Sequence, residues 1–91
     1  MGSELTMTVP GVVVVALDLD DRGQWPGTRV TEWLKHGRGW RVTITAPLLV
    51  WQAVVQEIED RLEREGGVEG SALRTALGRF ATTLRQELAG R

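Results

Sequence analysis

Residues 28–45 read TRVTEWLKHGRGWRVTIT, and this stretch decides the fold that we expect. Two runs rich in β-branched and aromatic residues, 28–35 and 40–45, flank the turn-forming residues 36–39. This pattern is typical of a β-hairpin, because strands favour Val, Ile, Thr and Trp whereas tight turns favour Gly. The predicted hairpin also carries Trp33, Trp40 and most of the local positive charge.

The number of residues in the hairpin loop decides which side chains share a face of the sheet. An even loop, either a two-residue turn at His36-Gly37 or a four-residue loop over residues 36–39, places Trp33 on the same face as Trp40. A three-residue loop reverses this arrangement. With an even loop, the opposite face holds Val30, Glu32 and Leu34. We expect an even loop, because a two-residue turn at His36-Gly37 would pair Trp33 with Trp40 and Glu32 with Arg41. Each such pair contributes about 0.2 to 1 kcal/mol.

Two further strands are predicted before the hairpin. Residues 5–9 alternate apolar and polar side chains, as a half-buried strand does. Residues 12–19 begin with VVVVAL, and such a short β-branched run indicates a strand that is covered on both faces. Pro10-Gly11 separates the two runs, so we expect residues 12–19 to form a central strand of their own.

Two amphipathic helices are predicted after the hairpin, over residues 46–65 and 71–89, because apolar residues recur there at spacings of three and four. The short glycine-containing loop between them indicates an antiparallel helical hairpin. The sequence therefore predicts a single α+β domain over residues 1–91. In it, a three- or four-stranded antiparallel meander precedes a C-terminal antiparallel helical hairpin that packs on one sheet face.

Composition limits the classes of function that we consider. The 91 residues have a formal net charge of -1 and include no cysteine, which excludes a disulfide framework and thiolate chemistry and fits a cytoplasmic protein. The longest apolar run, residues 12–17, is far below the roughly 20 residues that span a bilayer, so no membrane association is expected. His36 is the only histidine, so we expect neither a metal site nor a cofactor.

The strongest enzymatic candidate is the acidic end of residues 12–19, where Asp18 and Asp20 could hold Mg²⁺. Residues 12–21 resemble the first motif of haloacid dehalogenase-type phosphatases, a hydrophobic strand followed by Asp-x-Asp. The resemblance ends there, since Asp21-Arg22 stands where that motif has Gly-Thr. We interpret these acids as solvated side chains at a strand end and predict that the protein is not an enzyme.

The hairpin is the predicted contact surface. Its first strand carries large apolar side chains on both faces, and two helices can cover only one face of a sheet. We therefore predict a non-catalytic interaction module that forms a homo-oligomer, most simply a dimer, or docks to a protein partner through the open sheet face. The expected contact residues are Val30, Glu32, Trp33, Leu34, Arg38, Arg41, Leu49 and Val50.

Nucleic-acid binding is the alternative prediction. Basic side chains interleaved with tryptophan suit phosphates and exposed bases, and a two-stranded ribbon fits a major groove. The residues that would make this contact are Arg29, Lys35, His36, Arg38 and Arg41. The overall charge is close to neutral, whereas nucleic-acid-binding domains are usually basic, so we rank this function second.

Overall fold

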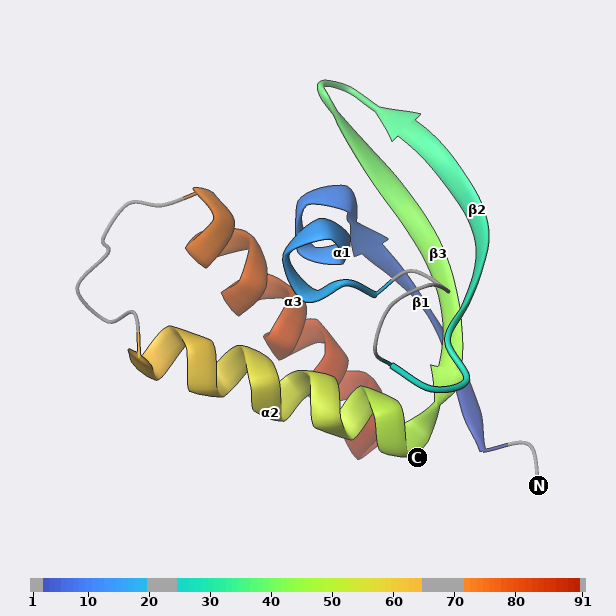
Figure 1. Ribbon diagram of the computed structural model, residues 1–91, viewed down its shortest axis with the longest axis vertical. Helices are drawn as coiled ribbons and strands as arrows, with labels where there is room; N and C mark the ends of the chain where they lie inside the picture. Colours follow the sequence, from blue (N-terminus) through green and yellow to red (C-terminus); the bar gives the residue numbers. More distant parts are fainter. Residues whose placement is uncertain (1–2, 20–24, 65–71, 91) are drawn as a thin grey trace.

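The computed structural model describes residues 3–19, 25–64 and 72–90. In these ranges a three-stranded antiparallel sheet carries three helices on one of its faces (Figure 1). The elements, in chain order, are β1 (Glu4–Pro10), α1 (Gly11–Leu17), β2 (Arg29–His36), β3 (Gly39–Pro47), α2 (Leu48–Arg64) and α3 (Ala72–Ala89). The predicted α+β class and the helical hairpin on one sheet face are confirmed.

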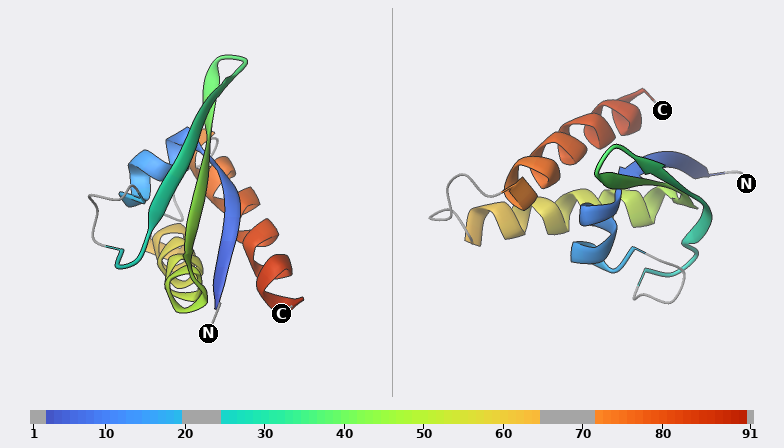
Figure 2. Two further views of the ribbon diagram at one scale, coloured as in Figure 1. Left: turned by 90° about the vertical axis from the view of Figure 1, so that its right-hand side faces the viewer. Right: turned by 90° about the horizontal axis from the view of Figure 1, so that it is seen from above.

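The strand order is β1-β3-β2, with β3 in the middle (Figure 2, left). β1 lies antiparallel to β3, from Glu4 opposite Pro47 to Pro10 opposite Arg41. Only the β2–β3 connection therefore joins neighbouring strands, and the chain passes from β1 to the far edge of the sheet through α1. Because β1 ends at Pro10, only β2 and β3 continue beyond that point.

The core lies between the sheet and the helices. Alternate residues of β1 and β3 are buried on the helix side; they are Leu5, Met7, Val9, Val42, Ile44 and Ala46. Trp51 of α2 is fully buried and donates its indole N–H to the carbonyl oxygen of Leu5 at 2.8 Å. Its ring also packs edge to face on Phe80 of α3, with centroids 6.1 Å apart. Trp51 thus joins both long helices to β1.

The prediction of a strand over residues 12–19 is wrong, because the valine run forms the helix α1. Valine is less favourable in a helix than alanine by up to about 0.7 kcal/mol, so packing overrides the local preference here. Helical spacing buries Val13, Val14 and Leu17 in the core and leaves Val12 and Val15 exposed. Half of the valine run is therefore core, and the other half is surface.

A left-handed residue ends α1. Asp18 has φ 53° and ψ 50°, and the backbone N–H groups of Asp18 and Leu19 donate to the carbonyl oxygens of Val15 and Val14 at 3.4 and 3.0 Å. This is the Schellman pattern, in which the following apolar residue packs back on the helix. Leu19 is buried accordingly, so the chain leaves α1 in a fixed direction.

Two side chains pair the remaining carbonyl groups at the end of α1. Arg61 of α2 donates from Nη1 to the carbonyl oxygen of Ala16 at 2.9 Å, and Trp25 donates from Nε1 to that of Leu17 at 2.6 Å. A helix leaves its last four carbonyl groups without partners inside the helix. All four are paired in α1, which fixes this short helix to its surroundings.

The hairpin between β2 and β3 has a two-residue loop, Gly37-Arg38, next to the pair His36 and Gly39. Gly37 has φ 61°, whereas Arg38 does not have a positive φ, as in a type II′ turn. The expectation of an even loop is confirmed. The expected pairing of Trp33 with Trp40 is wrong, because glycine takes the first loop position and thereby shifts the loop by one residue along the chain.

The resulting register places Trp33 opposite Val42 and Glu32 opposite Thr43, so the expected pairing of Glu32 with Arg41 is also wrong. A β-bulge between Val30 and Glu32 then reverses the faces at the start of β2. Val30 lies opposite the buried Ile44, on the helix side. The expectation that Val30 shares the open face with Glu32 is therefore wrong as well.

Candidate functional site

The tip of the β2–β3 hairpin extends beyond the helices that cover the rest of the sheet (Figure 1). Trp33 and Trp40 share the helix-side face there, but their side chains remain 47% and 49% exposed. Their rings meet edge to face, with centroids 6.3 Å apart and an interplanar angle of 76°. By contrast, Trp25 is partly buried and Trp51 is fully buried, and each donates its indole N–H to a backbone carbonyl oxygen. The hairpin tryptophans are therefore the pair available for contact.

An open groove of about 470 Å³ lies between the hairpin tip and α1. We call it the apolar groove. The residues that line it are Gly11, Val12, Val15, Ala16, Trp33, Gly39, Trp40 and Leu73. Six large hydrophobic side chains are exposed in the described part of the chain, and four of them line this groove: Val12, Val15, Trp33 and Trp40. Exposed apolar surface is thus concentrated at one concave place.

Gly11 allows α1 to approach the hairpin closely. A Cβ atom at this position would lie 3.0 Å from the Cβ of Trp40 and 3.4 Å from its carbonyl oxygen. The first distance is shorter than an ordinary van der Waals contact, so any larger residue would push α1 and β3 apart. Glycine therefore sets the distance between the two walls of the apolar groove.

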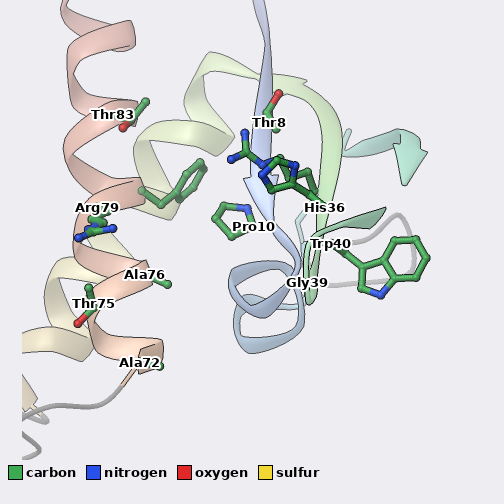
Figure 3. A pocket seen from close by; sticks show the side chains of 12 residues that line it. Thr8, Pro10, His36, Gly39, Trp40, Ala72, Thr75, Ala76, Arg79 and Thr83 are labelled. Atoms are coloured by element: carbon green, nitrogen blue, oxygen red, sulfur yellow. The ribbon is translucent and has the colours of Figure 1, made fainter. Parts of the chain in front are cut away.

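A second hollow, of about 480 Å³, lies between the hairpin and α3 (Figure 3). We call it the basic hollow. Its polar lining consists of His36, Arg41 and Arg79 together with Thr8, Thr75 and Thr83. In Figure 3, Arg79 and Thr83 on α3 lie across the hollow from His36 and Thr8, and the indole of Trp40 points away from it. No acidic side chain lines the hollow within the described ranges.

The open face of the sheet is mainly polar. Thr6 and Thr45 join their hydroxyl groups at 2.7 Å, and Arg29 donates to a carboxylate oxygen of Glu4 at 2.8 Å. Leu34 is the one exposed large hydrophobic side chain that the described strands place on this face. The open face therefore offers much less apolar contact area than the apolar groove on the other side.

The structure separates the predicted protein-contact residues. Trp33 lines the apolar groove, and Arg41 lines the basic hollow. Glu32 and Leu34 are exposed on the open face, and Arg38 is exposed in the turn. Leu49 is exposed at the start of α2, away from the hairpin tip (Figure 1). Val30 is only partly exposed, and Val50 is 8% exposed, so neither offers a free contact surface.

The predicted nucleic-acid residues are brought together more closely. Lys35, His36, Arg38 and Arg41 all lie at the hairpin tip. Arg29 lies at the opposite end of β2, where it is paired with Glu4. Sequence reasoning missed Arg79, which reaches the same hollow from α3. It also missed Val12 and Val15, because reading residues 12–19 as a buried strand assigned both to the core.

The described residues offer no cluster suited to holding a metal ion. They contain no group of three or more His, Cys, Asp or Glu side chains placed to hold a metal ion. Asp18 is exposed at the end of α1, and Asp20, its partner in the predicted Mg²⁺ site, lies outside the described residues. Every helix in the described ranges is too short or too polar to cross a bilayer.

Comparison with known proteins gives no match to a family model, a curated protein or a solved structure. The functional conclusion therefore depends on the geometry of the two hollows.

Proposed function

We propose that this protein is a non-catalytic interaction module that binds a segment of another protein chain in the apolar groove. The observation that carries the proposal is the convergence of Val12, Val15, Trp33 and Trp40 on one concave, exposed surface. Concentrated apolar surface of this kind marks interaction sites, and tryptophan is enriched among the residues that dominate binding energy. The absence of cysteine from the sequence fits a cytoplasmic location for the module.

The chemistry of the groove favours apolar side chains as its occupants. Sites for small molecules normally include a few polar groups that fix the orientation of the ligand. The side chains of the apolar groove supply only the two indole N–H groups for this purpose. Full burial of a large apolar side chain contributes about 1.5 to 3 kcal/mol, so four half-exposed ones offer roughly 3 to 6 kcal/mol. Association itself costs several kcal/mol, so this contribution supports only weak, reversible binding of a short segment.

A library of short random peptides, displayed in many copies so that weak binding is retained, tests the proposal. Peptides are selected on the wild-type chain and then measured against Val15→Asp, a change at a side chain that is 73% exposed. Leu49→Asp is the matched control, because Leu49 is 78% exposed and lies outside the groove. We expect the peptides to bind Val15→Asp at least about tenfold more weakly, since the buried charge would be unpaired, and to bind Leu49→Asp normally. Equal binding to all three proteins would refute the proposal.

In self-association, the segment bound in the apolar groove would belong to a second copy of the same chain. Sedimentation velocity up to about millimolar concentrations tests it, because weak binding would leave a dimer mostly dissociated at micromolar concentrations. A dimer that Val15→Asp converts to a monomer would place a second copy in the apolar groove. A monomer at every concentration would assign the groove to a different protein.

Nucleic-acid binding is the second candidate function, and the gathering of Lys35, His36, Arg38 and Arg41 at the hairpin tip favours it. Basic side chains in a row can track a phosphate backbone, and such binding weakens steeply with salt. A mobility shift with DNA or RNA at low salt, abolished by Arg38→Glu with Arg41→Glu, would support this function. The absence of a shift at low salt would exclude it.

A further inference from the structure

We propose that the protein segment bound in the apolar groove is acidic, with apolar side chains in the groove and neighbouring carboxylates in the basic hollow. This inference rests on the proposed function and adds the chemical character of the partner. It follows from the position of the two hollows and from the charges around them.

The two hollows are adjacent, because Gly39 and Trp40 line both of them. Trp40 stands at their junction, and its indole points away from the basic hollow (Figure 3). An extended chain advances about 3.3 Å per residue and points successive side chains in opposite directions. A segment of a few residues that crosses Trp40 can therefore place apolar side chains on one side and carboxylates on the other.

The basic side chains of the hollow differ from several other arginines in the part of the chain that the structure describes. Arg29, Arg61 and Arg85 form ion pairs with Glu4, Glu57 and Glu59 at 2.8, 2.8 and 3.3 Å. Arg41 and Arg79 form no ion pair with any residue in the described ranges, although both line the same hollow. Positive charge without a partner at the rim of an apolar site favours a ligand of opposite charge and speeds its association.

Lys35 lines neither hollow, but it is the cross-strand neighbour of Trp40. It lies directly opposite Trp40 in the hairpin, so the two side chains share the helix-side face. Basic groups therefore occur on both sides of the tryptophan. Acidic residues that flank an apolar pair in the bound segment would find a partner at either end.

An acidic peptide fits this surface better than a nucleic acid does. Val12, Val15 and Leu73 form an aliphatic wall of the groove, which offers a base no hydrogen-bond partner. The formal net charge of the chain is -1, so the field of the whole protein does not attract a polyanion. A short segment with a few carboxylates needs only the local charge of the hollow.

The composition of the selected peptides is the first part of the test. We expect those that depend on Val15 to combine aromatic or aliphatic residues with Asp or Glu. For one such peptide, replacement of each Asp by Asn and each Glu by Gln should weaken binding about tenfold at low salt, and added salt should reduce this difference.

Two double variants locate the carboxylate contacts. Arg41→Gln with Arg79→Gln removes two charges from the basic hollow, and we expect about tenfold weaker binding of the acidic peptide. Arg29→Gln with Arg64→Gln removes the same charge elsewhere and should leave binding within about twofold. Urea unfolding of both variants verifies that each remains folded.

The outcomes distinguish failure of the acidic-partner proposal from failure of the proposed function. Peptides that lack acidic residues but still require Val15 would overturn the acidic partner and leave the proposed function intact. Selection of no peptide that requires Val15 would overturn the proposed function itself. If oligo(dT) binds more tightly than the peptide and loses affinity in the Arg41 and Arg79 variant, the basic hollow would belong to a nucleic acid, and the acidic partner would be wrong.

Discussion

The rings of Trp33 and Trp40 meet edge to face, with centroids 6.3 Å apart, at the end of the sheet that the helices leave uncovered. Such an aromatic pair contributes about 0.5 to 1.5 kcal/mol beyond the area that it buries. Each ring therefore restrains the other while both remain half exposed. A contact surface that is ordered before binding loses less conformational entropy when its partner arrives.

The four tryptophans divide into structural and contact residues, and substitution should reveal the division. We expect Trp51→Ala to reduce the free energy of unfolding by about 3 to 5 kcal/mol, because it removes a fully buried ring. Trp40→Ala should cost about 1 kcal/mol, since it loses mainly the contact with Trp33. Urea unfolding monitored by circular dichroism measures both. Similar losses for the two variants would contradict the assignment of Trp40 as a contact residue.

The hydrogen bond from Arg61 to the carbonyl oxygen of Ala16 should stabilise α1, which forms one wall of the apolar groove. We expect Arg61→Gln to reduce the free energy of unfolding by about 1 to 2 kcal/mol, because it leaves a carbonyl group at the end of α1 without its charged donor. Arg64→Gln is the control. Arg64 contacts Glu57 at 3.6 Å and is more exposed, so its loss should cost under about 0.5 kcal/mol. Equal costs in urea unfolding would show that Arg61 does not fix α1.

Asp18 must hold its left-handed conformation for α1 to end where it does. A β-branched residue tolerates this conformation poorly, so Asp18→Val should lose about 1 to 2 kcal/mol of stability. Asp18→Gly should stay within about 0.5 kcal/mol of the wild type. Thermal unfolding of the two variants compares them. A stable Asp18→Val protein would mean that α1 has a different C-terminal end.

Gly78 lies in the interior of α3, and a Cβ atom there would meet no described atom within 4 Å. Gly78→Ala should therefore raise the free energy of unfolding by about 0.5 to 1 kcal/mol through helix propensity alone. The same change at Gly27, which has φ 79° and would approach Pro47 at 3.0 Å, should destabilise the protein. A loss of stability in Gly78→Ala would indicate that another chain packs closely against α3.

The sequence was sufficient to predict the elements that periodicity and turn chemistry specify. The two long helices lie within two residues of their expected ends where the structure describes them. The hairpin loop has the expected even number of residues, although the two cross-strand pairs that favoured it do not form. The valine run was misread because β-branched residues favour strands unless tertiary packing overrides them. The bulge after Val30 also left no local signal, and it changes which side chains face the helices.

The candidate site was predicted only in part. The hairpin tryptophans and the basic tip could be recognised in the sequence, but α1 and α3 supply the other walls of the two hollows. Arg79 lies 38 positions after Arg41, and no local pattern connects them. The position of such a site depends on how the helices pack against the sheet. That packing is determined by the whole core, so no short stretch of the sequence predicts it.

Binding in the apolar groove can be followed directly through the indole N–H signals of ¹⁵N-labelled protein, recorded by nuclear magnetic resonance during titration with a selected peptide. The four tryptophans give one such signal each. We expect the signals of Trp33 and Trp40 to shift with peptide concentration while that of the buried Trp51 stays in place. Unchanged Trp33 and Trp40 signals under conditions in which the peptide binds would contradict binding in the apolar groove.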